Sequence, residues 1–197
     1  MVFNKSVFKK MIKTAYKTLG LLVANKDGRI ILAGSWWMLS VEEKWFPKWG
    51  MAAVIELTGE IPAAGESFRS TTAGNQMELP NEFVLGLDEN YDNRAKSDPY
   101  LDTNILNDSG FDLVRYLRSG RNVVAVNEMI MELYDPGAGE EGELTDTELP
   151  RVDNKWVYWQ TPVCSWACGV IDYTKPEDIE FQNRLGLILQ EMQYQQQ

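Results

Sequence analysis

The fold is decided by a stretch near the start of the chain, which reads Leu21-Leu22-Val23-Ala24-Asn25-Lys26-Asp27-Gly28-Arg29-Ile30-Ile31-Leu32-Ala33. Apolar runs at 21–24 and 29–33 flank a polar segment whose Asp-Gly pair suits a tight turn with positive φ. This pattern predicts an antiparallel β-hairpin. A further apolar run at 37–41 predicts a third strand.

The segment before the hairpin has the pattern of an amphipathic helix over residues 6–19, ended by Gly20. A spacing of four drifts by only about 40° per step in an α-helix, so lysines at this spacing form one stripe. The stripe consists of Lys5, Lys9, Lys13 and Lys17, with Lys10 beside it. The apolar side chains fall on the opposite face: Phe8, Met11, Ile12, Ala15 and Leu19.

The lysines stand out because the whole chain carries a formal net charge of -10. Residues 1–50 hold nine Lys and Arg against three Asp and Glu, whereas residues 51–197 hold ten against twenty-six. No acidic residue precedes Asp27, so no carboxylate within the helix can pair with the lysines. We therefore predict a nucleic-acid-binding or anion-binding face. The alternatives are an ordinary solvated helix face and an interfacial membrane helix, which the modest apolar face without tryptophan disfavours.

The remainder of the chain predicts an α+β fold with a mainly antiparallel sheet. Further strands are expected at 51–57, 122–134, 156–160 and 163–173, with a helix over 128–134 as the alternative. A Ser109 and Asp112 capping pattern predicts a short middle helix to residue 118, and a C-terminal helix is expected from Thr174 through Met192. The acid-rich segments 86–108 and 135–153 are predicted loops.

Gly120 and the apolar run 123–126 repeat the order of Gly20 and 21–24, which suggests a pseudo-repeat of helix-plus-sheet units. We expect a single domain over 1–197. The alternative is two helix-plus-sheet halves, 1–85 and 109–192, joined by a polar loop.

Several kinds of chemistry are excluded or disfavoured by composition. The chain has no histidine, which removes Ser-His-Asp and Cys-His nucleophile systems and HExxH zinc enzymes. Cys164 and Cys168 should point to one face of a strand about 13 Å apart, too far for a disulfide. We expect buried free thiols, no metal, no cofactor and no catalytic residue, and the interpretation leans away from an enzyme.

Aromatic residues crowd into one part of the chain, where Trp36, Trp37, Trp45 and Trp49 fall within fourteen residues. Large aromatics in strands usually belong to the core. The lysines Lys44 and Lys48 nevertheless interleave with Trp45 and Trp49, which predicts a small aromatic recognition loop as well.

The apolar run 19–24 is far shorter than the roughly 20 residues that a membrane span needs. No signal peptide is apparent in the sequence. We therefore expect a cytoplasmic protein without a membrane partner.

Residues 6–41 resemble the repeating helix-hairpin module of DNA sliding clamps. The shared order is a helix, Gly20, an apolar run, Asp27-Gly28, a second apolar run and Gly34-Ser35. The resemblance implies that basic residues of the helix face DNA inside a ring. The chain differs from such clamps at Trp36-Trp37, where they often carry an acidic residue.

Two functions follow as hypotheses. The first is a non-catalytic interaction or assembly protein that uses the basic helix to contact an anionic partner, with DNA and a clamp-like homo-oligomer as one form of it. The second is a carboxylate-based enzyme or carbohydrate-binding module that uses the tryptophan cluster and the acidic loops. Exposed lysines with buried tryptophans favour the first, and a cleft lined by tryptophan and two close carboxylates favours the second.

Overall fold

The computed structural model describes residues 3–77, 84, 87, 98–108, 113–134, 149–153 and 155–194. Its strands are β1 Leu21–Lys26, β2 Arg29–Ala33, β3 Trp37–Glu42, β4 Ser67–Thr71, β5 Gly74–Met77, β6 Leu101–Asp108, β7 Leu113–Ser119, β8 Asn122–Asn127, β9 Arg151–Asp153, β10 Trp156–Gln160 and β11 Cys164–Gly169. Its helices are α1 Lys5–Lys17, η1 Glu43–Trp45, α2 Lys48–Thr58, α5 Glu128–Leu133 and α6 Pro176–Tyr194.

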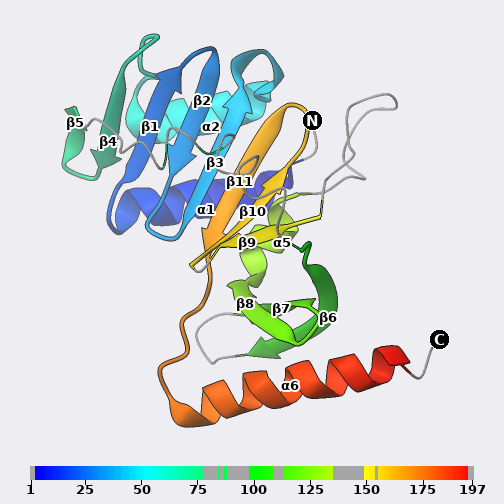
Figure 1. Cartoon of the computed structure of the whole chain (residues 1–197). Helices are drawn as coiled ribbons and strands as arrows, with labels where there is room; N and C mark the ends of the chain where they lie inside the picture. Colours follow the sequence, from blue (N-terminus) through cyan, green and yellow to red (C-terminus); the bar gives the residue numbers. More distant parts are fainter. Residues whose placement is uncertain are drawn as a thin grey trace.

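The strands form two antiparallel sheets, which confirms the predicted α+β class. The large sheet has eight strands in the order β5-β4-β1-β2-β3-β11-β10-β9, and the small sheet has three in the order β6-β7-β8 (Figure 1). The pairing of β3 with β11 joins the first part of the chain to the last strands. The small sheet and α5 are inserted in the chain between β5 and β9.

The first elements confirm the predicted helix and hairpin. Asn4 caps α1, because its side-chain Oδ1 accepts hydrogen bonds from the backbone N–H of Ser6 at 3.2 Å and of Val7 at 3.4 Å. The turn between β1 and β2 has positive φ at Asp27 (52°) and Gly28 (74°), which is the backbone of a tight hairpin turn. β3 pairs with β2 as the expected third strand.

The strand predicted at 51–57 is wrong, because these residues belong to α2. Pro47 precedes the helix, and Gly59 ends it in the left-handed conformation at φ 83°. The buried residues recur at helical spacing: Gly50, Ala53, Val54 and Thr58. A short apolar run fits a buried helix as well as a strand, and here the flanking residues decide for the helix.

The short middle helix predicted over 109–118 is also wrong. Residues 109–112 lie outside the described residues, and Leu113–Ser119 is strand β7, paired on both sides with β6 and β8. Gly120 lies in the hairpin turn that follows β7, with φ 57°. Because a strand and not a helix precedes Gly120, the helix expected for the second unit of the pseudo-repeat is absent there.

The two predicted acidic loops are corrected in part. Leu101–Asp108 forms β6 and Arg151–Asp153 forms the edge strand β9, whereas 88–97 and 135–148 lie outside the described residues. The alternative of a helix at 128–134 is confirmed by α5. The pair β10–β11 is confirmed, but β11 ends at Gly169 and residues 170–174 continue without strand pairing.

The main core lies on one face of the large sheet, beneath α1 and α2, and extends to the small sheet. It contains Leu21, Val23, Leu39 and Trp166 from the large sheet, with Leu117 and Val126 from the small sheet. Helix α6 covers the far face of the small sheet, where Leu185 packs against Val114, Tyr116 and Ala125 (Figure 1). Within the described residues, no helix has the length and hydropathy to cross a membrane.

Candidate functional site

The lysine stripe lies on the outer face of α1. The opposite face of this helix buries Val7, Phe8, Met11, Ile12 and Ala15, so the helix is oriented by its apolar side chains. All five lysines are exposed: Lys5, Lys9, Lys10, Lys13 and Lys17. None of them forms an ion pair with another residue in the part of the chain that the structure describes. The helix therefore presents an uncompensated positive surface.

The chain leaves α1 through a turn that fixes its C-terminal end. Gly20 has φ 92°, and its N–H donates to the carbonyl of Ala15 at 2.9 Å. From β4, Arg69 donates through Nη1 to the carbonyl of Gly20 at 3.3 Å. Because the carbonyl of Gly20 lies just after the end of α1, this hydrogen bond joins the turn to β4.

The residues of the predicted aromatic recognition loop have different environments. Trp49 lies edge-on against Phe8, with ring centroids 5.4 Å apart. Its ring therefore covers the core next to α1. Trp45 is 39% exposed. The Lys44 amino group forms an ion pair with Glu42 at 2.8 Å and lies 5.9 Å from the Trp45 ring centroid. Lys48, at the start of α2, is exposed.

The other two residues of the tryptophan cluster, Trp36 and Trp37, also differ in their burial. Trp37 is 3% exposed and belongs to the main core, whereas Trp36 is half-buried. Trp36 lines a groove of about 520 Å³ between the end of the large sheet and the small sheet with α6. The groove also contains Trp156, Tyr173, Lys155, Asp172 and Gln182.

The groove is built around the segment that connects β11 to α6. Three backbone hydrogen bonds of 2.8 Å hold this segment: Gly169 N–H to the Trp36 carbonyl, Val170 N–H to the Lys155 carbonyl, and Ile171 N–H to the Ala125 carbonyl. The first two acceptors belong to the large-sheet side and the third belongs to β8. The connecting segment is therefore fixed to both walls of the groove.

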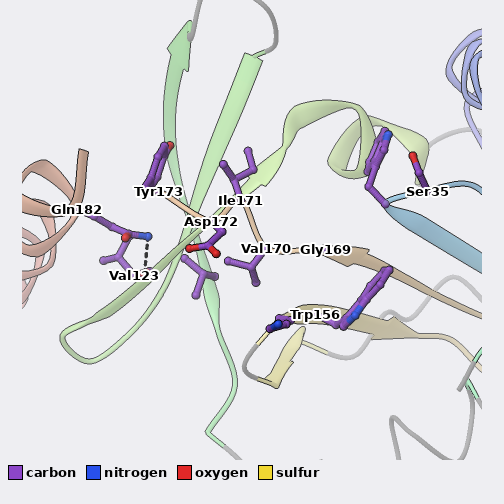
Figure 2. Close-up of a pocket in the computed structure, with 12 residues that line it drawn as sticks. Ser35, Val123, Trp156, Gly169, Val170, Ile171, Asp172, Tyr173 and Gln182 are labelled. Carbon is purple, nitrogen blue, oxygen red and sulfur yellow. Dashed lines mark hydrogen bonds between the residues drawn. The ribbon is translucent and has the colours of Figure 1, made fainter. Parts of the chain in front are cut away.

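Side chains from α6 and the connecting segment complete one wall. Gln182 donates through Nε2 to the carbonyl of Val123 at 2.9 Å. The hydroxyl of Tyr173 lies 3.0 Å from that of Tyr116, and burial, with this hydrogen bond, raises the pKa of Tyr173. In Figure 2, Asp172 lies between the side formed by Val123 and Gln182 and the side that carries Trp156.

The cysteines lie where the sequence predicts, on β11. Cys164 and Cys168 are free and buried, and both belong to the main core with Trp166 between them. Burial raises the pKa of the Cys168 thiol far above its ordinary value. These thiols are therefore poor nucleophiles in the folded protein.

Sequence reasoning singled out the lysines and found Trp36, but it missed the groove. Trp156, Asp172, Tyr173 and Gln182 come from separate segments, and no spacing in the sequence connects them with Trp36. The carboxylate pairs that could be formed by neighbours in sequence, such as Glu56 on α2 with Glu60 just after the helix, lie outside this groove.

Comparison of the chain with protein-family models and with curated protein sequences gives no match, so the candidate sites rest on the geometry described above.

Proposed function

We propose that this chain is a non-catalytic interaction or assembly protein that uses the lysine face of α1 to contact an anionic partner. The observation that carries the proposal is the exposure of five lysines on a helix that contains no acidic residue. Each lysine can release a counterion from a polyanion when it contacts a phosphate, which favours binding at low salt. DNA, in a sliding-clamp-like arrangement, is the partner to test first.

The lysine stripe lowers the stability of α1, and this loss supports a binding role. Like charges at i, i+4 destabilise a helix by a few tenths of a kcal/mol per pair, whereas alternating Glu and Lys would stabilise it. Lys5, Lys9, Lys13 and Lys17 form three such like-charged steps, and no carboxylate on α1 offsets them. Solubility alone does not require this arrangement, because the chain is already strongly acidic.

The acidic remainder of the protein has a consequence for any DNA complex. A net charge of -10 repels phosphates, so the basic helices bind best when several copies place them together on one surface. We therefore couple DNA binding to self-association, and we propose the cytoplasm as the location of the protein.

The test is a triple substitution of Lys9, Lys13 and Lys17 to Glu, compared with Lys26, Lys175 and Arg184 to Glu. Both variants change the net charge equally, and all six residues are exposed. The α1 variant should abolish binding to a DNA duplex while thermal stability stays nearly unchanged, and the control variant should still bind. Three phosphate contacts should give a slope of about -3 in log affinity against log salt.

The same experiment includes the mass of the protein in solution. A monomer with no detectable DNA binding below about 50 mM salt, where phosphate contacts are least screened, would remove the clamp-like proposal. Equal loss of binding in both triple variants would show that only net charge matters, which also contradicts a site on α1.

A further inference from the structure

Two tryptophans in the groove differ from those of the core. Trp37, Trp159 and Trp166 are at most 5% exposed, whereas Trp36 and Trp156 are half-buried and line the groove. An indole ring offers an apolar face and an N–H donor at its edge. Such a ring can stack on the C–H face of a sugar ring, a surface that is apolar although its edges carry hydroxyl groups.

The polar side chains of the groove include both donors and acceptors. Lys155 supplies a cationic donor and Asp172 an anionic acceptor, and both side chains are exposed. Gln182 uses its Nε2 for the Val123 carbonyl, which leaves its Oε1 as an acceptor. The described lining residues thus carry one positive and one negative group. This balance suits a neutral ligand with many hydroxyls, because each hydroxyl both donates and accepts.

The same polar groups disfavour the anionic partner proposed for α1. A phosphate in the groove would lie near the carboxylate of Asp172, which repels it. A simple cation would in turn meet the amino group of Lys155. The chemistry of the groove is therefore distinct from that of the lysine stripe.

The groove is also preformed, which lowers the entropic cost of binding. The connecting segment is held by backbone hydrogen bonds to Trp36, Lys155 and Ala125, and Gln182 is held by Val123. Its volume of about 520 Å³ falls within the range of 300–1,000 Å³ that is usual for small-molecule sites.

We propose that this groove binds a neutral carbohydrate, with Trp156 and Trp36 as stacking surfaces and Asp172, Lys155 and Gln182 as hydrogen-bonding groups. The proposal concerns binding and not hydrolysis. Glycoside hydrolysis ordinarily uses a pair of carboxylates, and Asp172 is the one carboxylate among the described lining residues. The site does not depend on the function proposed for α1.

The experiment titrates the full chain with four neutral oligosaccharides: maltotetraose, cellotetraose, xylotetraose and triacetylchitotriose. Binding is measured by calorimetry and by saturation-transfer difference NMR, each up to about 5 mM ligand, which detects dissociation constants as weak as about 1 mM. At least one oligosaccharide should bind saturably, with the strongest transfer to ring C–H protons because these face the indole.

The variants locate the site. Trp156→Ala and Asp172→Asn should each weaken binding by about tenfold or more, because one removes a stacking surface and the other a charged acceptor. Asp172 is exposed, so its substitution leaves the fold intact even if Trp156→Ala does not fold. Glu177→Gln, an exposed carboxylate on α6 outside the groove, is the matched control and should bind as the unmodified chain does.

Three results would overturn the proposal. The first is no binding of any of the four oligosaccharides. The second is binding of adenosine or uridine in their place, which would assign the aromatic surfaces to a nucleobase. The third is loss of binding in Trp45→Ala without loss in Trp156→Ala and Asp172→Asn, which would place the site at the aromatic loop around η1.

Discussion

Arg115 on β7 and Glu128 at the start of α5 form a bidentate ion pair across the small sheet. The Nε of Arg115 donates to Oε2 of Glu128 at 2.8 Å, and its Nη2 donates to Oε1. The two side chains are only 15% and 9% exposed. The hydrogen bond to Glu128 raises the pKa of Arg115, so the guanidinium stays charged at any accessible pH. The pair ties α5 to the sheet on which it packs.

Removing one partner of this pair should be strongly destabilising. We expect Glu128→Ala to lower the free energy of unfolding by about 3 kcal/mol, because it leaves the Arg115 charge without its main acceptor. The double variant Arg115→Met with Glu128→Leu should recover part of this loss. Urea unfolding measures both. A loss below about 1 kcal/mol in the single variant would mean that Asp102, 3.5 Å from Arg115, replaces Glu128.

The two buried cysteines should react slowly in the native protein and rapidly after unfolding. Their thiols are at most 1% exposed, and burial disfavours the thiolate of Cys168. The measurement is thiol labelling followed by intact mass, with and without denaturant. Fast native labelling of both residues, or a mass two protons low without reductant, would contradict the assignment.

Cys168 should also make stability depend on pH in alkaline solution. Its folded pKa is raised, whereas the unfolded thiol loses its proton near pH 8.5, at about the ordinary value. The contribution is therefore fully present below about pH 8.5 and declines as pH rises, because only the unfolded chain releases the proton. The urea midpoint should fall less between about pH 8 and 10 in Cys168→Ala than in the unmodified chain. Equal declines would show that the thiol does not contribute.

Trp49 and Trp45 provide a matched pair of substitutions in one short segment. Trp49→Ala should cost about 2–3 kcal/mol, since it removes the edge-on contact with Phe8 and leaves a gap above α1. Trp45→Ala should cost less than about 1 kcal/mol, since Trp45 is 39% exposed and belongs to none of the described core clusters. Thermal unfolding of both variants decides this, and a reversed order would mean that Trp45 is the packed residue.

Alanine substitutions at Gly20 and Gly59 distinguish the effect of backbone strain from that of steric crowding. Both have positive φ, but only Gly20 has close neighbours: an added Cβ would lie 2.7 Å from Cγ of Arg69 and 2.9 Å from Cγ2 of Thr71. Gly59→Ala should cost about 1 kcal/mol from the left-handed backbone alone. Gly20→Ala should cost about 2–3 kcal/mol, because the crowding is added to the strain. Equal losses would show that Arg69 moves aside freely.

The elements that could be predicted from the sequence are those whose determinants are contiguous. The hairpin of β1 and β2 has its apolar runs and its Asp27-Gly28 turn within thirteen residues, and β10 and β11 flank Thr161-Pro162 in the same way. The lysine stripe follows from helical periodicity alone. In each case the local pattern and the tertiary environment favour the same structure.

The two wrong predictions, a strand at 51–57 and a helix at 109–118, have a common physical cause: each local pattern is compatible with both a helix and a strand. The run 51–57 could pack as a strand or as a buried helix, and Pro47 and Gly59 were the decisive residues. At 109–118 the capping pattern favours a helix, whereas the alternation of Val114 and Tyr116 favours a strand. The strand forms, and both side chains face α6. The groove could not be predicted, because it exists only after distant segments have packed.

The pairing of β3 with β11 determines when the large sheet can be completed. Trp37 is opposite Cys168 and Val41 is opposite Cys164, more than a hundred residues apart along the chain. During synthesis the first five strands emerge long before β11, and β3 is then an open edge with unpaired backbone groups and apolar side chains. Such a nascent chain can add a strand from a neighbouring chain at this edge, so the last strands of the protein also protect the first ones from aggregation.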